Sequence, residues 1–160
     1  LLPYTTLFRS HGPVIGWYPL EEKPNAKILV LRYLTEGGAA PSTGKFLTYR
    51  EIPWGEVYFK QFQGRCLFRL AFGFGGKLDA FREIMERVGA QAISSGDVGY
   101  ELEFMKGLFV RLILWAGDDE FPPSAQILFS DNFPAAFTQG EDMAVVGDVT
   151  IDMLKALAAK

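Results

Sequence analysis

The densest group of side chains that could do chemistry is an acidic run, Asp118, Asp119 and Glu120, between Trp115 and Phe121. Three carboxylates on a tight turn supply the hard oxygen ligands that divalent cations prefer. A solvated acidic turn, whose charges discourage pairing between sheet edges, would explain the same residues. The run therefore nominates Asp118, Asp119 and Glu120 as metal-ligand candidates, with the solvated turn as the competing interpretation.

A second group could line a cleft and bind a ligand: Tyr49, Arg50, Glu51, Asp97 and Trp115. The triplet from Tyr49 to Glu51 fits equally well as two surface charges beside an anchored tyrosine. Trp115 ends a predicted strand, and we expect it to pack inward, together with Phe121, so that the two rings hold the acidic turn between them. These five residues are the ligand-binding candidates.

The sequence gives little support to catalysis by a serine or cysteine nucleophile. The chain has one histidine, His11, and one cysteine, Cys66. A serine or cysteine hydrolase needs a base beside its nucleophile, and His11 has no secondary-structure signal around it. Apolar neighbours predict that Cys66 is a buried, inert thiol. Catalytic residues therefore stay unassigned.

Composition excludes several classes of function. The 160 residues are 49% hydrophobic and 22% charged, with a net charge of -3, so the chain lacks the cationic surplus that nucleic-acid binding draws on. The longest apolar run, residues 108–116, is interrupted by Arg111 and is far shorter than the roughly 20 residues of a membrane span. We expect a cytoplasmic protein that binds a small molecule or another protein, and its oligomeric state is left open.

The helices are expected at both ends of the chain. Pro24 suits a first helical turn and Gly37 a stop, so residues 24–36 form a helix that we expect to be buried on most sides. Residues 56–72 have helical spacing, weakened at Gly64. Residues 78–88 are strongly amphipathic and end at Gly89. The spacing of Thr138 and Glu141 predicts a capping box before a closing C-terminal helix.

Strand patterns occupy the region between these helices. Residues 98–104 alternate between apolar and polar, which is typical of a half-buried strand. After a Lys-Gly turn, residues 108–115 form a second, more apolar strand that we expect in the interior of the sheet. Residues 126–129 return as a third strand. The sequence therefore predicts an α+β fold, with an antiparallel meander over about residues 98–130 packed against several helices.

The start of the sequence is set apart from the fold prediction. Residues 3–10 read PYTTLFRS, which resembles the translation of a sequencing-adapter oligonucleotide. We therefore expect residues 1–10 to be an artefactual tail and residues 11–160 to be one domain, truncated at its N-terminus.

Several segments together resemble the prokaryotic family catalogued as domain of unknown function 3786. They are residues 28–34 (ILVLRYL), 41–54 (PSTGKFLTYREIPW), 96–97 (GD), 114–129 (LWAGDDEFPPSAQILF) and 141–147 (EDMAVVG). The resemblance spans about residues 14–157, and the stretch from Trp115 to Phe129 is its specific part. It implies relatives in anaerobic bacteria and archaea, some with an additional iron-sulfur domain, and it brings no known reaction or site residues.

From this resemblance we expect a binding or accessory domain that functions in anaerobic iron-sulfur or one-carbon metabolism. With Cys66 alone the chain holds no cofactor of its own, so any iron-sulfur cluster would belong to a missing segment or to a partner. Two alternatives stay open: a divalent-metal-dependent enzyme that uses residues 118–120, and a structural interaction module.

Overall fold

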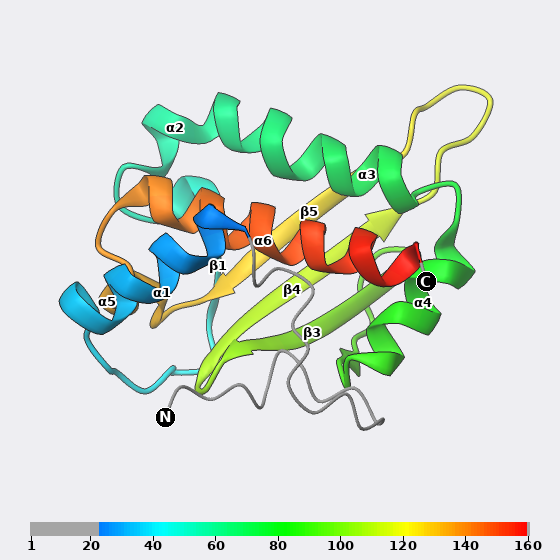
Figure 1. Cartoon of the computed structure of the whole chain (residues 1–160). Helices are drawn as coiled ribbons and strands as arrows, with labels where there is room; N and C mark the ends of the chain where they lie inside the picture. Colours follow the sequence, from blue (N-terminus) through cyan, green and yellow to red (C-terminus); the bar gives the residue numbers. More distant parts are fainter. Residues whose placement is uncertain (1–22, 160) are drawn as a thin grey trace.

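An antiparallel sheet forms one layer of the protein, and its strands lie in the order β1-β5-β4-β3-β2. The structure is a computed structural model that describes residues 23–159. The strands are β1 (Phe46–Thr48), β2 (Gln91–Ala92), β3 (Val98–Met105), β4 (Leu108–Trp115) and β5 (Ser124–Ser130). The predicted meander is confirmed as β3, β4 and β5, and the very short strands β1 and β2 extend it at its two edges (Figure 1).

The central strand explains the apolar pattern of residues 108–115. β4 pairs with β3 on one side and with β5 on the other, so Val110 lies opposite both Leu102 and Phe129. Its buried residues include Leu112 on the helix-covered face and Ile113 on the other face. Two-sided burial favours apolar residues at successive positions, as the sequence suggested.

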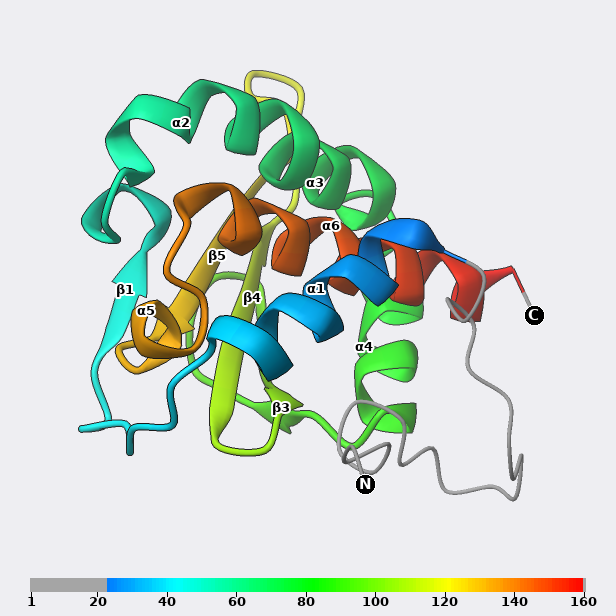
Figure 2. The same cartoon turned by 60° about the vertical axis from the view of Figure 1, so that its left-hand side comes forward.

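The helices cover one face of this sheet, and the fold is α+β as predicted (Figures 1 and 2). They are α1 (Pro24–Glu36), α2 (Gly55–Phe62), α3 (Phe68–Phe74), α4 (Leu78–Arg87), the short α5 (Phe133–Ala136) and the closing helix α6 (Gly140–Ala158). Helix α6 lies between α1 and the α2–α3 pair, so both its sides are packed. This central position explains why most residues of α6 are buried.

Helices α2 and α3 are joined by a π-helical turn over Gln63–Leu67. The turn falls where Gly64 was expected to weaken the helix, and the chain continues through it without a break. A π turn accommodates one residue more than an α-helical turn, and such turns are often found at functional sites. It rotates α3 relative to α2 and thereby sets which side chains of α3 face outward.

The π turn packs against α6 at a glycine. A side-chain Cβ at Gly147 would lie only 2.7 Å from Cys66 Sγ and 3.3 Å from Cys66 Cβ. Only a glycine lets the two helices come this close. Cys66 is fully buried, as expected, and its thiol donates to the carbonyl oxygen of Ala144 at 3.4 Å. Burial raises the pKa of this thiol, which keeps it protonated and inert.

Two expectations about the helices are wrong. Only Ala26 and Leu29 of α1 are buried, while Ile28, Leu31 and Leu34 are exposed, because α1 packs on α6 through one narrow face. The capping box of Thr138 and Glu141 is not formed: Gln139 is the N-cap of α6 and makes no capping bond with its side chain. At the first residue of α6, a Cβ on Gly140 would lie 3.0 Å from the carbonyl oxygen of Pro53, so the backbone of Pro53 lies close to the helix start.

Some expectations fall on residues that the structure does not describe. The tail of residues 1–10 and the histidine at position 11 lie outside residues 23–159. Within that described range, no helix has the length and apolar character needed to cross a membrane.

Gly147→Ala should lower the free energy of unfolding by about 1–3 kcal/mol, because the new methyl group collides with the buried Cys66. The matched control is Gly64→Ala, where a Cβ meets nothing within 4 Å and should stabilise by up to about 1 kcal/mol. Urea denaturation of both variants measures the difference. Equal effects of the two substitutions would show that the close approach at Gly147 is not tight.

Candidate functional site

The predicted candidate Tyr49 is a core residue. Its ring stacks on Phe62 with centroids 4.0 Å apart, and its hydroxyl donates to the carbonyl oxygen of Gly140 at 2.7 Å. Burial raises the pKa of the phenol, so it stays protonated. Tyr49 therefore ties the segment after β1 to α2 and to the start of α6.

The neighbouring charges Arg50 and Glu51 also make local contacts. Arg50 forms two bonds of 2.7 Å to Glu56 and lies over the ring of Phe59 at 4.6 Å. The Glu51 carboxylate accepts the backbone N–H of Thr48 at 2.7 Å and its hydroxyl at 2.9 Å, which lowers the pKa of Glu51. These contacts match the interpretation of surface charges beside an anchored tyrosine.

A cavity of about 200 Å³ lies elsewhere, between the end of α1 and the β3–β4 turn. Its walls include Tyr33, Lys106 and Asn132. The amide of Asn132 already donates to the carbonyl oxygens of Ala40 and Gly107 at 2.9 and 2.7 Å. None of the ligand-binding candidates lines this cavity. Tyr49, Arg50 and Glu51 follow β1, whereas Asp97 and Trp115 lie at the base of the β4–β5 loop.

The acidic run lies on the exposed loop between β4 and β5. One carboxylate oxygen of Asp118 accepts the backbone N–H groups of Phe121 and Glu120, at 2.7 and 2.8 Å. These bonds lower the pKa of Asp118. At the base of the same loop, Asp97 accepts the backbone N–H of Ala116 at 2.8 Å. Both carboxylates thus fix the shape of the loop.

A metal-binding role for this loop stays a prediction. Within residues 23–159, no three or more His, Cys, Asp or Glu side chains are grouped so that they could hold a metal ion. Of the two carboxylate oxygens of Asp118, Oδ1 accepts both backbone N–H groups of its own loop.

The expectation that Trp115 and Phe121 pack inward is wrong. Trp115 is 39% exposed and Phe121 68% exposed. Side chains alternate along a strand, so Trp115 points to the face opposite that of the buried Leu114. The loop is instead anchored by Pro123, which packs so closely on Gly75 at the end of α3 that a Cβ there would lie 2.4 Å from Pro123 Cβ.

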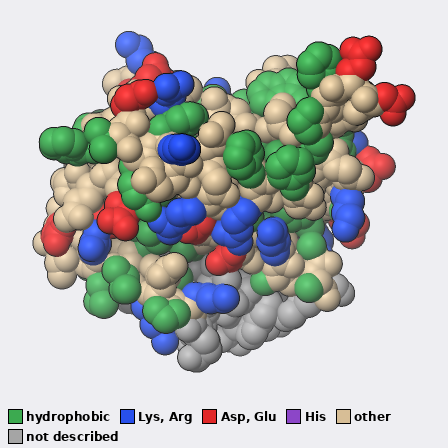
Figure 3. Space-filling model, turned by 90° about the horizontal axis from the view of Figure 1, so that it is seen from above, with side chains coloured by type: hydrophobic (Ala, Val, Ile, Leu, Met, Phe, Trp, Pro, Cys, Tyr) green, Lys and Arg blue, Asp and Glu red, His purple; other side chains and the backbone are tan. Residues whose placement is uncertain are grey.

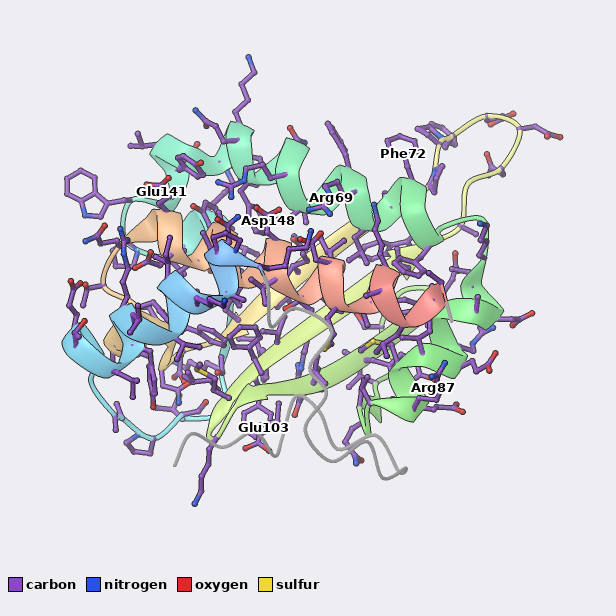
Figure 4. All side chains as sticks on the ribbon, viewed as in Figure 1. Arg69, Phe72, Arg87, Glu103, Glu141 and Asp148 are labelled. Carbon is purple, nitrogen blue, oxygen red and sulfur yellow. The ribbon has the colours of Figure 1, made fainter. Side chains whose placement is uncertain are left out.

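Sequence reasoning missed an ion-pair seam between α6 and the α2–α3 segment. Asp148 of α6 is buried and accepts from two arginines: Arg65 donates through Nε at 2.9 Å and also through a second nitrogen, and Arg69 donates at 2.9 Å. Arg69 also pairs with Asp152, and Arg65 donates to the hydroxyl of Tyr58 at 2.7 Å. Figure 4 shows Arg69 and Asp148 meeting at this seam.

The seam stabilises charges that burial alone would disfavour. Burial lowers the pKa of the Arg65 and Arg69 guanidinium groups, but their bonds to Asp148 and Asp152 outweigh this effect and shift both pKa values upward. The signal was present in the sequence as two pairs at helical spacing, Arg65 with Arg69 and Asp148 with Asp152. The sequence does not reveal the π turn, so it could not show that the two arginines face the two aspartates of α6.

Above the seam, α3 exposes aromatic side chains. Phe68 and Phe72 are 49% and 65% exposed and lie next to each other, with ring centroids 6.1 Å apart. Phe121 belongs to the loop that packs on the end of α3. We call Phe68, Phe72 and Phe121 the aromatic patch; Figure 3 shows hydrophobic side chains gathered over this region, and Figure 4 shows Phe72 beside the loop.

The family model described as "Domain of unknown function (DUF3786)" matches residues 10–153, which is most of the chain. The match agrees with the resemblance found in the sequence. No curated protein and no solved structure matches significantly.

Asp148→Asn should destabilise the protein by about 1–3 kcal/mol, because two partly buried guanidinium groups lose their shared carboxylate. The matched control is Asp152→Asn, which should cost less than about 1 kcal/mol because this carboxylate is one-third exposed. Thermal unfolding of the two variants at neutral pH measures both effects. A smaller loss for Asp148→Asn than for the control would contradict the seam.

Protonation of Asp118 should loosen the β4–β5 loop. Its folded-state pKa lies below the ordinary value, so its bonds to Glu120 and Phe121 are present at neutral pH and are lost as the pH falls through that lowered pKa. The amide-proton shifts of Glu120 and Phe121 in an NMR titration should therefore change below about pH 4. Asp118→Asn should abolish the change, Asp119→Asn should leave it, and a midpoint above pH 4 would contradict the account.

Proposed function

The chain belongs to the DUF3786 family of domains of unknown function, and we propose that it is a non-catalytic accessory domain that works by binding another protein through the aromatic patch. The observation that supports this most is the exposure of three phenylalanine rings, two on α3 and one on the loop that packs on the end of α3. Contiguous exposed apolar surface marks interaction sites in proteins.

The contacts that hold α3 and the β4–β5 loop in place favour binding through the aromatic patch. Helix α3 is held from below by Asp148 and Asp152 through Arg69, and the loop that carries Phe121 is held by Asp118 and Pro123. A preorganised surface loses little conformational entropy when a partner binds. Aromatic side chains fixed in this way provide large contact areas at low cost.

The residues that could do chemistry have structural partners. Tyr49 is bonded in the core, Arg50 and Glu51 pair locally, and Cys66 is a buried protonated thiol. This arrangement supports recognition by a surface more than covalent chemistry in a cleft.

The accessory role that we propose lies in anaerobic iron-sulfur or one-carbon metabolism. Its support is what the resemblance of the motif between Trp115 and Phe129 implies, namely relatives in anaerobic bacteria and archaea. With one buried cysteine in this chain, an iron-sulfur cluster would be carried by the partner or by a segment outside this sequence.

Site-directed photo-crosslinking tests this function, because the buried Cys66 leaves an introduced cysteine as the accessible thiol within the described residues. Phe72→Cys, labelled with a benzophenone maleimide and mixed with anaerobic extract from an organism that encodes a family member, should give a discrete adduct on illumination. Excess unlabelled chain should compete for the adduct, and a Phe68→Asp/Phe72→Asp chain should not.

The control is Leu31→Cys, which carries the same label at a 59% exposed apolar position on α1. It should give no competed adduct. Identical adducts from both positions, or no competed adduct from position 72, would contradict a docking role for the patch.

A further inference from the structure

A straight row of exposed positions runs along the α2–α3 segment: Lys60, Gly64, Phe68 and Phe72. In an uninterrupted α-helix of about 3.6 residues per turn, Lys60 and Phe68 would point about 80° apart. The π turn between them absorbs one residue, and that removes about 100° of rotation. The π turn therefore aligns Lys60 with the two rings, and we call these four residues the helix row.

The helix row has a cation at one end and carboxylates at the other. Lys60 is exposed at the N-terminal end of the row. At the other end, the contact of Pro123 with Gly75 places the β4–β5 loop, with the exposed Asp119 and Glu120, beside the end of α3. Figure 3 shows acidic side chains at one end of the gathered hydrophobic ones, and side chains of both charges elsewhere around them.

We propose that a second copy of this chain binds the helix row, with the two α2–α3 segments antiparallel across a two-fold axis near Phe68. Such an interface is self-complementary, because each contact between two different residues occurs twice. From the N-terminal end, the row carries Lys60, the open position at Gly64, the rings of Phe68 and Phe72, and then the acidic β4–β5 loop. In the antiparallel partner this order is reversed, so Lys60 faces the acidic loop, Gly64 faces Phe72, and the two Phe68 rings face each other at the axis.

The spacing supports this match. With the axis at Phe68, Phe72 of one copy faces Gly64 of the other, and Lys60 faces the β4–β5 loop. A Cβ at Gly64 would meet nothing within 4 Å, so this position is open and can receive a ring. The Phe68 rings meet at the centre, where aromatic pairs contribute most to an interface. The Lys60 pairs with Asp119 or Glu120 then lie at the rim, where charges set register and orientation.

This inference rests on the proposed function, since it names the occupant of the same patch. The proposed function and the self-association can be contradicted independently of each other. Purified chain alone decides self-association, whereas the crosslinking experiment above detects other partners even when the chain is a monomer.

Sedimentation velocity of the purified full chain over a range from low micromolar to near-millimolar concentration tests the proposal. The wild-type chain should shift from monomer to dimer, and Phe72→Asp should remain a monomer over the same range. Leu31→Asp, an equally exposed apolar position on α1, should dimerise as the wild type does. Circular dichroism spectra identical to that of the wild type confirm that both variants fold.

A charge exchange tests the orientation. Lys60→Glu and Glu120→Lys should each weaken the dimer by about tenfold, which is about 1.4 kcal/mol, and the double variant should recover most of the affinity. The control Glu83→Lys, on the exposed face of α4, should leave the dimer unchanged.

A wild-type chain that stays monomeric throughout would overturn the proposal. A dimer that survives Phe72→Asp would overturn it as well, because another surface would then hold the copies together. Additive losses in the double charge variant would overturn the antiparallel arrangement.

Discussion

The close approach of α6 to the π turn is the contact on which the rest of the structure depends. Gly147 lets α6 come within van der Waals reach of Cys66, and the next residue, Asp148, then reaches Arg65 and Arg69. Removing one partner from a buried carboxylate that two guanidinium groups share leaves an uncompensated charge, which is strongly destabilising. The contact therefore fixes both the height and the rotation of α3 above the sheet.

The outward-facing side chains of α3 follow from that fixed rotation. The residues of α3 that face inward, Leu70 and Phe74, pack in the core, and α3 contacts β4 and β5. The same rotation turns Phe68 and Phe72 to solvent and brings the end of α3 against Pro123 of the β4–β5 loop. The way α6 holds the π turn thus places Phe68 and Phe72 in the aromatic patch. The core positions of α3 are filled by Leu70 and Phe74, so the two exposed rings are not needed there.

The sequence predicted the elements well and the site poorly, for physical reasons. Alternation and helical spacing reveal burial, so the strands from Val98 to Ser130 and the helix ending at Arg87 could be found. The same spacing does not reveal a π turn, which shifts the helical phase after Gly64 and decides where Phe68 points. Apolar character alone predicts burial for Phe121 and Trp115, and this prediction is wrong because exposed apolar groups are ordinary on protein surfaces and at interaction sites.

Intermolecular NMR contacts in a mixed sample test the central claim most directly, namely that the seam holds α3 in the rotation that makes the helix row self-complementary. Chains with ¹³C-labelled phenylalanine are mixed with chains in which only glycine is labelled, and filtered spectra retain contacts between copies. The account predicts cross-peaks from the ring protons of Phe72 to the α-protons of Gly64. Cross-peaks from Phe72 to other glycines alone, or no contacts between copies at near-millimolar concentration, would contradict it.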